Sequence, residues 1–150
     1  MIEAVSKENI KAVLPLIRAY QEFYQVADIC DNKNAEFFSQ FNQSSQLGCQ
    51  FMYKEQGEVV GFATVYFSYA SSIIAKVAIL NDLYTLPKAR GKGVGKKLIE
   101  HCQKYAAANN AARLQWVTAP DNQAAQKLYD AMNTKKSTWN FYTYNGESIV

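Results

Sequence analysis

The sequence predicts a mixed α/β fold with a largely antiparallel sheet and one crossover connection. Three observations support this prediction. A hairpin pattern occupies the middle of the first half, a long strand rich in β-branched residues follows it, and a glycine-rich stretch then opens a helix. Antiparallel strands need only a tight turn between them, whereas a helix between two strands permits a parallel pair.

The first half begins with a short strand, IEAV, that leads into a helix. Ser6 is expected to cap this helix, because serine side chains accept hydrogen bonds from unpaired amides of the first turn. Its apolar face has helical spacing and comprises Ile10, Val13, Leu14, Ile17 and Tyr20. A second helix is expected around residues 35–41. CQFMYKEQGEVVGFATVYFSY is then typical of a hairpin that turns at Gln56-Gly57.

The second half alternates strands and helices. Residues 72–86, SIIAKVAILNDLYTL, are apolar on both faces and predict a central strand. The helix after the glycines is marked by apolar residues at helical spacing: Val94, Leu98, Cys102 and Tyr105. RLQWVTA (113–119) predicts a strand, and a helix starts at Asp121 or Asn122. An aromatic strand over residues 137–144 is expected to close the fold.

Length and composition indicate a single domain, residues 1–150, that is long enough to bury a core. The start of the chain has neither a basic segment nor an apolar segment typical of a signal peptide, and no apolar run is long enough to span a bilayer. We therefore expect a cytoplasmic protein without a membrane partner. Cys30, Cys49 and Cys102 are odd in number and widely spaced, so we expect reduced thiols and no metal site.

Charge is distributed unevenly along the chain. Residues 1–60 carry eight acidic and five basic side chains (8 − 5, net −3), whereas residues 61–150 carry five acidic and eleven basic ones (11 − 5, net +6). One half would suit a cationic ligand and the other an anionic one. Ordinary solvated surface explains the same numbers equally well.

The stretch PKARGKGVGKKL, residues 87–98, is the most informative motif. A P-loop would need glycine and then Gly-Lys-Ser/Thr after four residues, but Lys96 stands where the second glycine belongs. A dinucleotide-binding loop also fails at Lys96, and Gln115 and Trp116 stand near the place of its ribose-binding acid. Five bases in one loop fall short of a basic face with stacking aromatics, so nucleic acid is not an expected partner. A glycine-rich surface turn is the remaining structural alternative.

The stretch does satisfy the pattern Arg/Gln-x-x-Gly-x-Gly/Ala between a long strand and a helix. With LNDLYTLPKAR before it and N-x-x-A-x-x-L-Y after it, the sequence resembles the GCN5-related N-acetyltransferase (GNAT) family over nearly its full length. The small histone- and polyamine-type members are the most similar. The resemblance implies a mostly antiparallel central sheet with splayed parallel strands and flanking helices, and an N-acetyltransferase that uses acetyl-CoA in a ternary complex.

The resemblance also implies where acetyl-CoA binds. Unpaired amides at a helix N-terminus favour anions, and glycine leaves room for close approach. The expected pyrophosphate-binding residues are Arg90, Gly91, Lys92, Gly93, Val94, Gly95 and Lys96. The pantetheine arm is expected along the exposed backbone of Leu83, Tyr84 and Thr85, with a polar contact from Asn122. Asn122 as a plain helix N-cap is the alternative.

Two residues are implied to act on the reacting groups. Tyr129 would protonate the departing CoA thiolate, since a phenol with pKa of about 10 keeps its proton at neutral pH. Asp82 would hold the acceptor ammonium and help pass its proton to water. Polyamine-type members have a second acid just before this one, and Asn81 replaces it here. This difference argues against polyamine specificity. A core tyrosine and a plain surface aspartate are the alternatives.

The acceptor is expected to be a small-molecule primary amine, or a lysine- or polyamine-like one. Glu22, Tyr24 and Asp28 lie where the family's first helices often wall the acceptor site, although no motif selects them. The closing aromatic segment favours a homodimer contact. A non-catalytic acyl-CoA-binding sensor is the main functional alternative, and a nucleotide-binding module is a weaker one.

Overall fold

The computed structural model describes residues 1–146. Met1–Val117 form one compact unit and the chain from Thr118 onward forms a second, and the two units are described separately. Within residues 1–146, no helix combines the length and apolar character that a membrane span requires.

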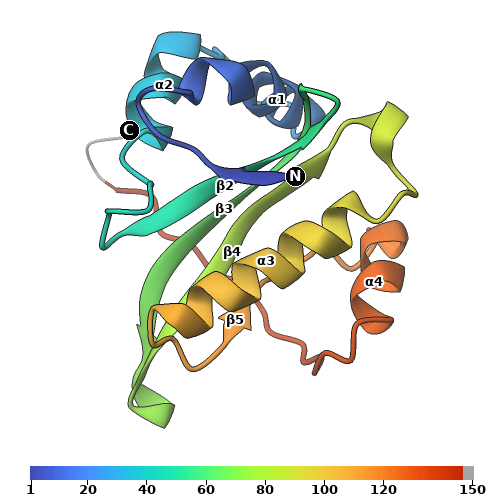
Figure 1. Cartoon of the computed structure of the whole chain (residues 1–150). Helices are drawn as coiled ribbons and strands as arrows, with labels where there is room; N and C mark the ends of the chain where they lie inside the picture. Colours follow the sequence, from blue (N-terminus) through green and yellow to red (C-terminus); the bar gives the residue numbers. More distant parts are fainter. Residues whose placement is uncertain (147–150) are drawn as a thin grey trace. The chain divides into compact units, whose positions relative to one another are not determined.

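Met1–Val117, all of which are described, form a five-stranded sheet with three α-helices (Figure 1). The elements in chain order are β1 (Ile2–Ala4), α1 (Ile10–Phe23), α2 (Asp31–Phe38), β2 (Gly48–Glu55), β3 (Glu58–Ala70), β4 (Ala75–Thr85), α3 (Val94–Ala108) and β5 (Leu114–Gln115). Short 3-10 turns precede β4 at Ser71–Ile73 and follow it at Pro87–Ala89.

The sheet has the order β1-β2-β3-β4-β5, so each strand lies beside its neighbour in sequence. The first four strands are antiparallel, and β5 runs parallel to β4 after the α3 crossover. The β2–β3 turn consists of Gln56 and Gly57, whose φ angles of 50° and 80° suit a two-residue turn between twisted strands. The predicted hairpin, the mixed sheet and the single crossover are therefore confirmed.

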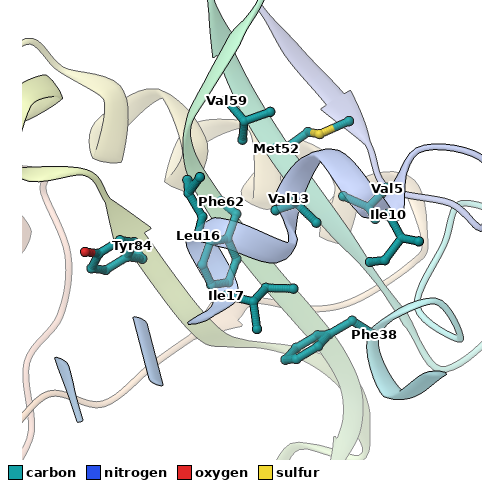
Figure 2. Packing of buried hydrophobic residues seen from close by; sticks show 10 residues of the cluster. All are labelled: Val5, Ile10, Val13, Leu16, Ile17, Phe38, Met52, Val59, Phe62 and Tyr84. Carbon is teal, nitrogen blue, oxygen red and sulfur yellow. The ribbon is translucent and has the colours of Figure 1, made fainter. Parts of the chain in front are cut away.

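The two faces of the sheet are covered by different helices. Phe62 of β3 belongs to a buried cluster with Val13 and Ile17 of α1 (Figure 2). The neighbouring residue Gly61 points to the other face, where a Cβ would lie 3.0 Å from the Val94 side chain of α3. Since successive residues of a strand face opposite sides, α1 covers one face and α3 covers the other.

Strand β4 has two irregularities that shape the site. Thr64 pairs with Asp82 while Val65 pairs with Leu80, so Asn81 is an extra residue that makes a β-bulge. Pairing with β5 is limited to Ala78 with Leu114 and Ile79 with Gln115. Within the described chain, β4 therefore continues from Leu80 to Thr85 without a partner on its β5 side.

The predicted start of the first helix is wrong. The helix begins at Ile10 after Asn9 rather than directly after Ser6, although Ser6 Oγ does accept from the Glu8 amide at 3.3 Å. The Asn9 side chain turns back to accept from the Ser6 amide at 2.7 Å, and residues 7–9 form a turn. Ile10, Val13 and Ile17 are buried as predicted, and Leu14 and Tyr20 are partly buried against the same cluster. Leu16 is a further buried residue that the prediction left out.

Other boundaries also move. The second helix runs from Asp31 to Phe38 rather than over residues 35–41. The central strand begins at Ala75, since Ile74 has a left-handed φ of 51° that ends the preceding 3-10 turn. The strand predicted at residues 113–119 is only Leu114–Gln115, because its partner residues on β4 end at Ile79.

The second unit contains α4 (Gln123–Asp130). Its N-cap is Asn122, one of the two predicted starts, and the Asn122 side chain accepts from the Ala125 amide at 3.2 Å. The closing strand predicted at residues 137–144 is wrong, since this segment has no regular secondary structure. An extended segment becomes a strand only when another strand pairs with it, and none of the described strands does so.

Candidate active site

The loop between β4 and α3 has the backbone that the glycines permit. Gly91 and Gly93 adopt φ angles of 77° and 84°, which side-chain-bearing residues rarely adopt. A Cβ at either position would meet nothing within 4 Å. The glycines therefore permit the left-handed backbone conformation of the loop. They also leave open space beside it, because no neighbouring atom of the described chain lies there.

Backbone amides of this loop are available to a ligand. The Arg90 amide donates to Pro87 and the Lys97 amide donates to Gly93 at 3.0 Å, which is the first hydrogen bond of α3. Between them, the amides of residues 91–96 donate to no acceptor within the described chain. Unpaired amides at a helix start, with the partial positive charge of the helix dipole, form a site for an anion such as a pyrophosphate.

Basic side chains around the loop are engaged to different degrees. Lys88 pairs with Glu58, and Lys96 lies 3.9 Å from Glu100. Lys92 helps line a cavity of about 390 Å³ beside the β2–β3 turn, which also contains Glu55 and Glu58. These acids make that cavity unsuitable for a phosphate, so the loop amides are the better anion site.

The open edge of β4 leads directly into the loop. The Leu86 amide donates to the Val60 carbonyl of β3. In an antiparallel pair, residues whose backbone groups bond the neighbouring strand alternate with residues whose backbone groups point away from it. The backbone groups of Leu83 and Thr85 therefore face the side without a β5 partner. Arg90 Nε donates to the Thr85 carbonyl at 2.9 Å, which leaves Leu83 and the Thr85 amide for an extended ligand.

The Tyr84 backbone was expected to contact the pantetheine arm, but it does not face the open edge of β4. Its backbone groups point to β3, and its side chain is buried in the cluster under α1. The Arg90 guanidinium lies 5.6 Å from the centre of the Tyr84 ring, within cation–π range. Tyr84 therefore supports the loop by holding Arg90.

Asp82 is a buried carboxylate on the α1 face of the sheet, only 6% exposed. Asn81 donates to its Oδ1 at 3.1 Å. Its Oδ2 is buried and has no hydrogen-bond partner of normal geometry among the described residues. No lysine, arginine or histidine of residues 1–146 forms an ion pair with it. When it is ionised, this carboxylate therefore has no counter-ion among these residues.

Burial raises the pKa of Asp82, because the charged form loses solvation. Interactions with Thr64, Tyr20 and Asn81 act in the opposite direction and lower that pKa. The Thr64 and Tyr20 hydroxyls thus interact with the carboxylate without reaching ideal hydrogen-bond geometry to Oδ2. An incoming ammonium would supply both the missing charge and the missing donor.

Tyrosines surround the carboxylate. Burial and the Asp82 charge raise the pKa of Tyr20, and they raise the pKa of Tyr66 to about 12. Both phenols therefore keep their protons at neutral pH. Tyr20 packs against Tyr24 at 4.9 Å and against Tyr84 at 5.9 Å between ring centres.

The sequence-predicted acceptor residues are only partly brought together. Tyr24 is exposed and packs against Tyr20, which interacts with Asp82. Glu22 and Asp28 are exposed, Asp28 in a turn with φ of 56°. Tyr20, Thr64 and Tyr66 were missed as site residues, because Tyr20 fits the apolar face of α1. One feature of the sequence could have indicated this site: Thr64 is a polar residue within the apolar run of β3.

Asn122 and Tyr129 belong to the second unit. The Asn122 side chain caps α4, so its structural role is confirmed, while a contact with the cosubstrate stays a prediction. Tyr129 is half-buried within α4, and its carbonyl accepts from the Thr134 hydroxyl at 2.8 Å. Its role as an acid stays a prediction.

Comparisons with known proteins agree with this geometry. The family profile described as "Acetyltransferase (GNAT) family" matches residues 14–133. An uncharacterized N-acetyltransferase, YhfO of Bacillus subtilis (strain 168), is 31% identical and covers 91% of this chain and 91% of its own. The D-amino-acid N-acetyltransferase HPA3 of Saccharomyces cerevisiae is 30% identical over 86% of this chain and 81% of its own.

More distant similarities extend over nearly the whole chain. A thialysine N-epsilon-acetyltransferase of Bos taurus is 26% identical over 99% of this chain and 94% of its own. The crystal structure of a probable acetyltransferase has a TM-score of 0.83 at 25% identity, covering 98% of both chains. The aminoglycoside acetyltransferase AAC(6')-Iy, solved with a bisubstrate analogue of CoA, has a TM-score of 0.81 at 21% identity, covering 97% of this chain and 98% of its own. This last similarity concerns the fold alone.

The profile spans most of the chain, and the loop, the open β4 edge and the sheet order match what the sequence motif implies. The chain belongs to the GNAT family and is an N-acetyltransferase.

Proposed function

We propose that this enzyme transfers the acetyl group of acetyl-CoA to a primary amine of a small molecule, or to a lysine- or polyamine-like acceptor, by direct attack in a ternary complex. The observation that carries the proposal is Asp82, a buried carboxylate without a counter-ion among residues 1–146. It lies on β4 three residues before Thr85, next to the strand edge that would hold the cosubstrate. An ammonium group is the ligand that such a carboxylate lacks.

The residues of the first unit fit acetyl-CoA. The unpaired amides of residues 91–96 would bind the pyrophosphate, and Arg90, held against Tyr84, shapes the start of the loop. Leu83 and the Thr85 amide would bind the amide groups of the pantetheine arm as an added strand does. Asn122 would add a polar contact.

Asp82 and Tyr129 would manage the two proton transfers. An alkyl ammonium has a pKa near 10.4 and must lose a proton before its nitrogen attacks. Asp82 would hold the ammonium and help deliver that proton to water. As the C–N bond forms and the C–S bond breaks, Tyr129 would donate its phenolic proton to the CoA sulfur. The nitrogen would lose its second proton as the amide forms, and that proton would return to the tyrosine through water. For this chemistry both units would act together as one domain over residues 1–150.

A panel of amines tests the proposal through acetyl-CoA-dependent release of free thiol. Relatives named for D-amino acids and thialysine make small amines of these kinds the first acceptors to test. We expect Asp82→Asn to raise the KM for the best amine or lower kcat, while acetyl-CoA affinity by calorimetry stays nearly unchanged. Glu8→Gln, which changes an exposed acid in the turn before α1, is a control.

Unaltered kinetics in Asp82→Asn would contradict the role of this carboxylate. Binding of acetyl-CoA without thiol release for any amine would instead favour a non-catalytic acyl-CoA sensor. Stabilisation by ATP but not by CoA would point to a nucleotide-binding module.

The closing segment supports a homodimer. Four aromatic side chains there are at least 85% exposed: Trp139, Phe141, Tyr142 and Tyr144. Such a concentration of exposed aromatics is typical of an interface. Light scattering should give twice the mass of one chain, and Phe141→Ser with Tyr144→Ser should yield a monomer. A monomeric wild-type protein would refute the dimer.

A further inference from the structure

Three polar residues stand directly opposite one another on three adjacent strands. Gln50 of β2 pairs with Thr64 of β3, and Thr64 pairs with Asp82 of β4. Gln50 and Thr64 are fully buried, and Asp82 nearly so. Buried polar groups carry a desolvation cost unless they are hydrogen-bonded, so such a line interrupting an apolar face calls for an explanation.

The hydrogen bond between Gln50 and Thr64 has a direction. Gln50 Nε2 donates to Thr64 Oγ1 at 3.1 Å. Because the threonine oxygen accepts this bond, its single proton is free for its other neighbour, Asp82, whose carboxylate interacts with Thr64. The opposite amide orientation would let Gln50 accept the Thr64 proton and take it from Asp82. The negative charge of Asp82 therefore favours Gln50 as the donor, which leaves Gln50 Oε1 buried without a partner among the described residues.

We propose that Gln50 and Thr64 are positioning residues for Asp82: the Gln50–Thr64 hydrogen bond directs the Thr64 hydroxyl proton at the Asp82 carboxylate and keeps it ionised and oriented for the acceptor ammonium. This inference rests on the proposed role of Asp82 in holding the acceptor. Neither residue need touch the substrate, since both act through the carboxylate.

The groups that face Asp82 make a pH measurement interpretable. Tyr20 of α1 and Tyr66 of β3 are the titratable neighbours, with Tyr24 behind Tyr20, and both Tyr20 and Tyr66 keep their protons through neutral pH. On β4 the Asn81 amide donates to the carboxylate, and Gln50 of β2 acts on it through Thr64. Asp82 itself is therefore the acidic group of this cluster, and its NMR titration identifies its ionisation in the kinetic profile.

The test compares Thr64→Val, which keeps the shape and removes the hydroxyl, with Thr64→Ser, which keeps the hydroxyl. Two readouts are needed: the 13C NMR titration of the Asp82 carboxyl in the free protein, and the pH profile of kcat/KM for the best amine. In Thr64→Val the titration and the acid limb should both move to higher pH. On that limb kcat/KM should fall about tenfold, as expected for loss of one hydrogen bond to a charged group.

Thr64→Ser should restore the wild-type titration and profile, which a purely structural role of the threonine methyl group would not allow. Gln50→Met leaves Thr64 in place and should move the titration in the same direction by a smaller amount. It provides the answer if Thr64→Val does not fold. An Asp82 titration that is unchanged in the folded variants would overturn the inference. If the Asp82 titration shifts but the pH profile of kcat/KM does not, the influence of Thr64 on the carboxylate is supported. The proposed role of Asp82 in acetyl transfer is then refuted.

Discussion

Replacing Gly93 by valine should separate the cost to folding from the loss of cosubstrate binding. Gly93 has a φ of 84° and immediately precedes α3, with open space where a Cβ would project. No atom of the described chain lies within 4 Å of that Cβ. The folding cost is therefore only that of holding a β-branched residue in the left-handed region, about 1–3 kcal/mol.

The expected loss of affinity is larger than this strain explains. The new side chain would occupy the space through which a pyrophosphate approaches the amides of residues 91–96. Each hydrogen bond from an amide to a charged phosphate contributes about 1.5–3 kcal/mol. Losing one weakens binding about ten- to hundredfold, because each 1.4 kcal/mol is a factor of ten. We expect CoA affinity to fall by at least about tenfold.

Calorimetry with CoA measures the affinity, and thermal unfolding measures the strain. Gly57→Val is the matched control, since Gly57 has a φ of 80°, also has nothing within 4 Å of a Cβ, and lies in the β2–β3 turn. Both variants should lose stability similarly, but only Gly93→Val should lose CoA. Gly95→Val, inside the first turn of α3, should lose it too. Intact CoA affinity in Gly93→Val and Gly95→Val would refute the loop as the pyrophosphate site.

Three further predictions concern catalysis, pH and packing. Tyr129→Phe should lower kcat at least about tenfold with acetyl-CoA affinity little changed, since general acid catalysis is typically worth about a hundredfold or more. A folded variant with wild-type kcat would show that Tyr129 is not the general acid and only packs against its neighbours. Burial raises the pKa of Asp82, so its contribution to stability is fully present below its unfolded pKa of about 3.9 and is lost as pH rises through the folded pKa. Asp82→Asn should therefore have a higher Tm than the wild type at pH 7.5, and the gain should shrink as pH falls toward 4; a constant gain would contradict the pKa shift. Gly48→Ala should lower Tm by about 10 °C, because its Cβ would lie 1.9 Å from the Val65 carbonyl oxygen, a clash worth about 3 kcal/mol or more. An unchanged Tm would show that the β2–β3 backbone gives way there.

The features that the sequence predicted well depend on neighbours along the chain. The Gln56-Gly57 turn, the α3 periodicity and the glycine loop each follow from the conformational preferences of a few adjacent residues. Asp82 was singled out by the family resemblance, which the local motif LNDLYTLPKAR carries. The closing strand was wrong for the converse reason, since a strand needs a partner that local pattern does not supply.

The environment of Asp82 depended on the tertiary structure alone. Gln50, Thr64 and Asp82 are far apart in sequence and meet only because the β2–β3 turn and the Asn81 bulge set the strand register. A shift of one residue in either pairing would turn these side chains to different faces. Tyr20, which has the spacing of a core residue, reaches the carboxylate only because α1 packs on that face of the sheet. The sequence by itself thus determined the family and the cosubstrate loop, while the register of three strands and the placement of one helix determined how the buried charge is held.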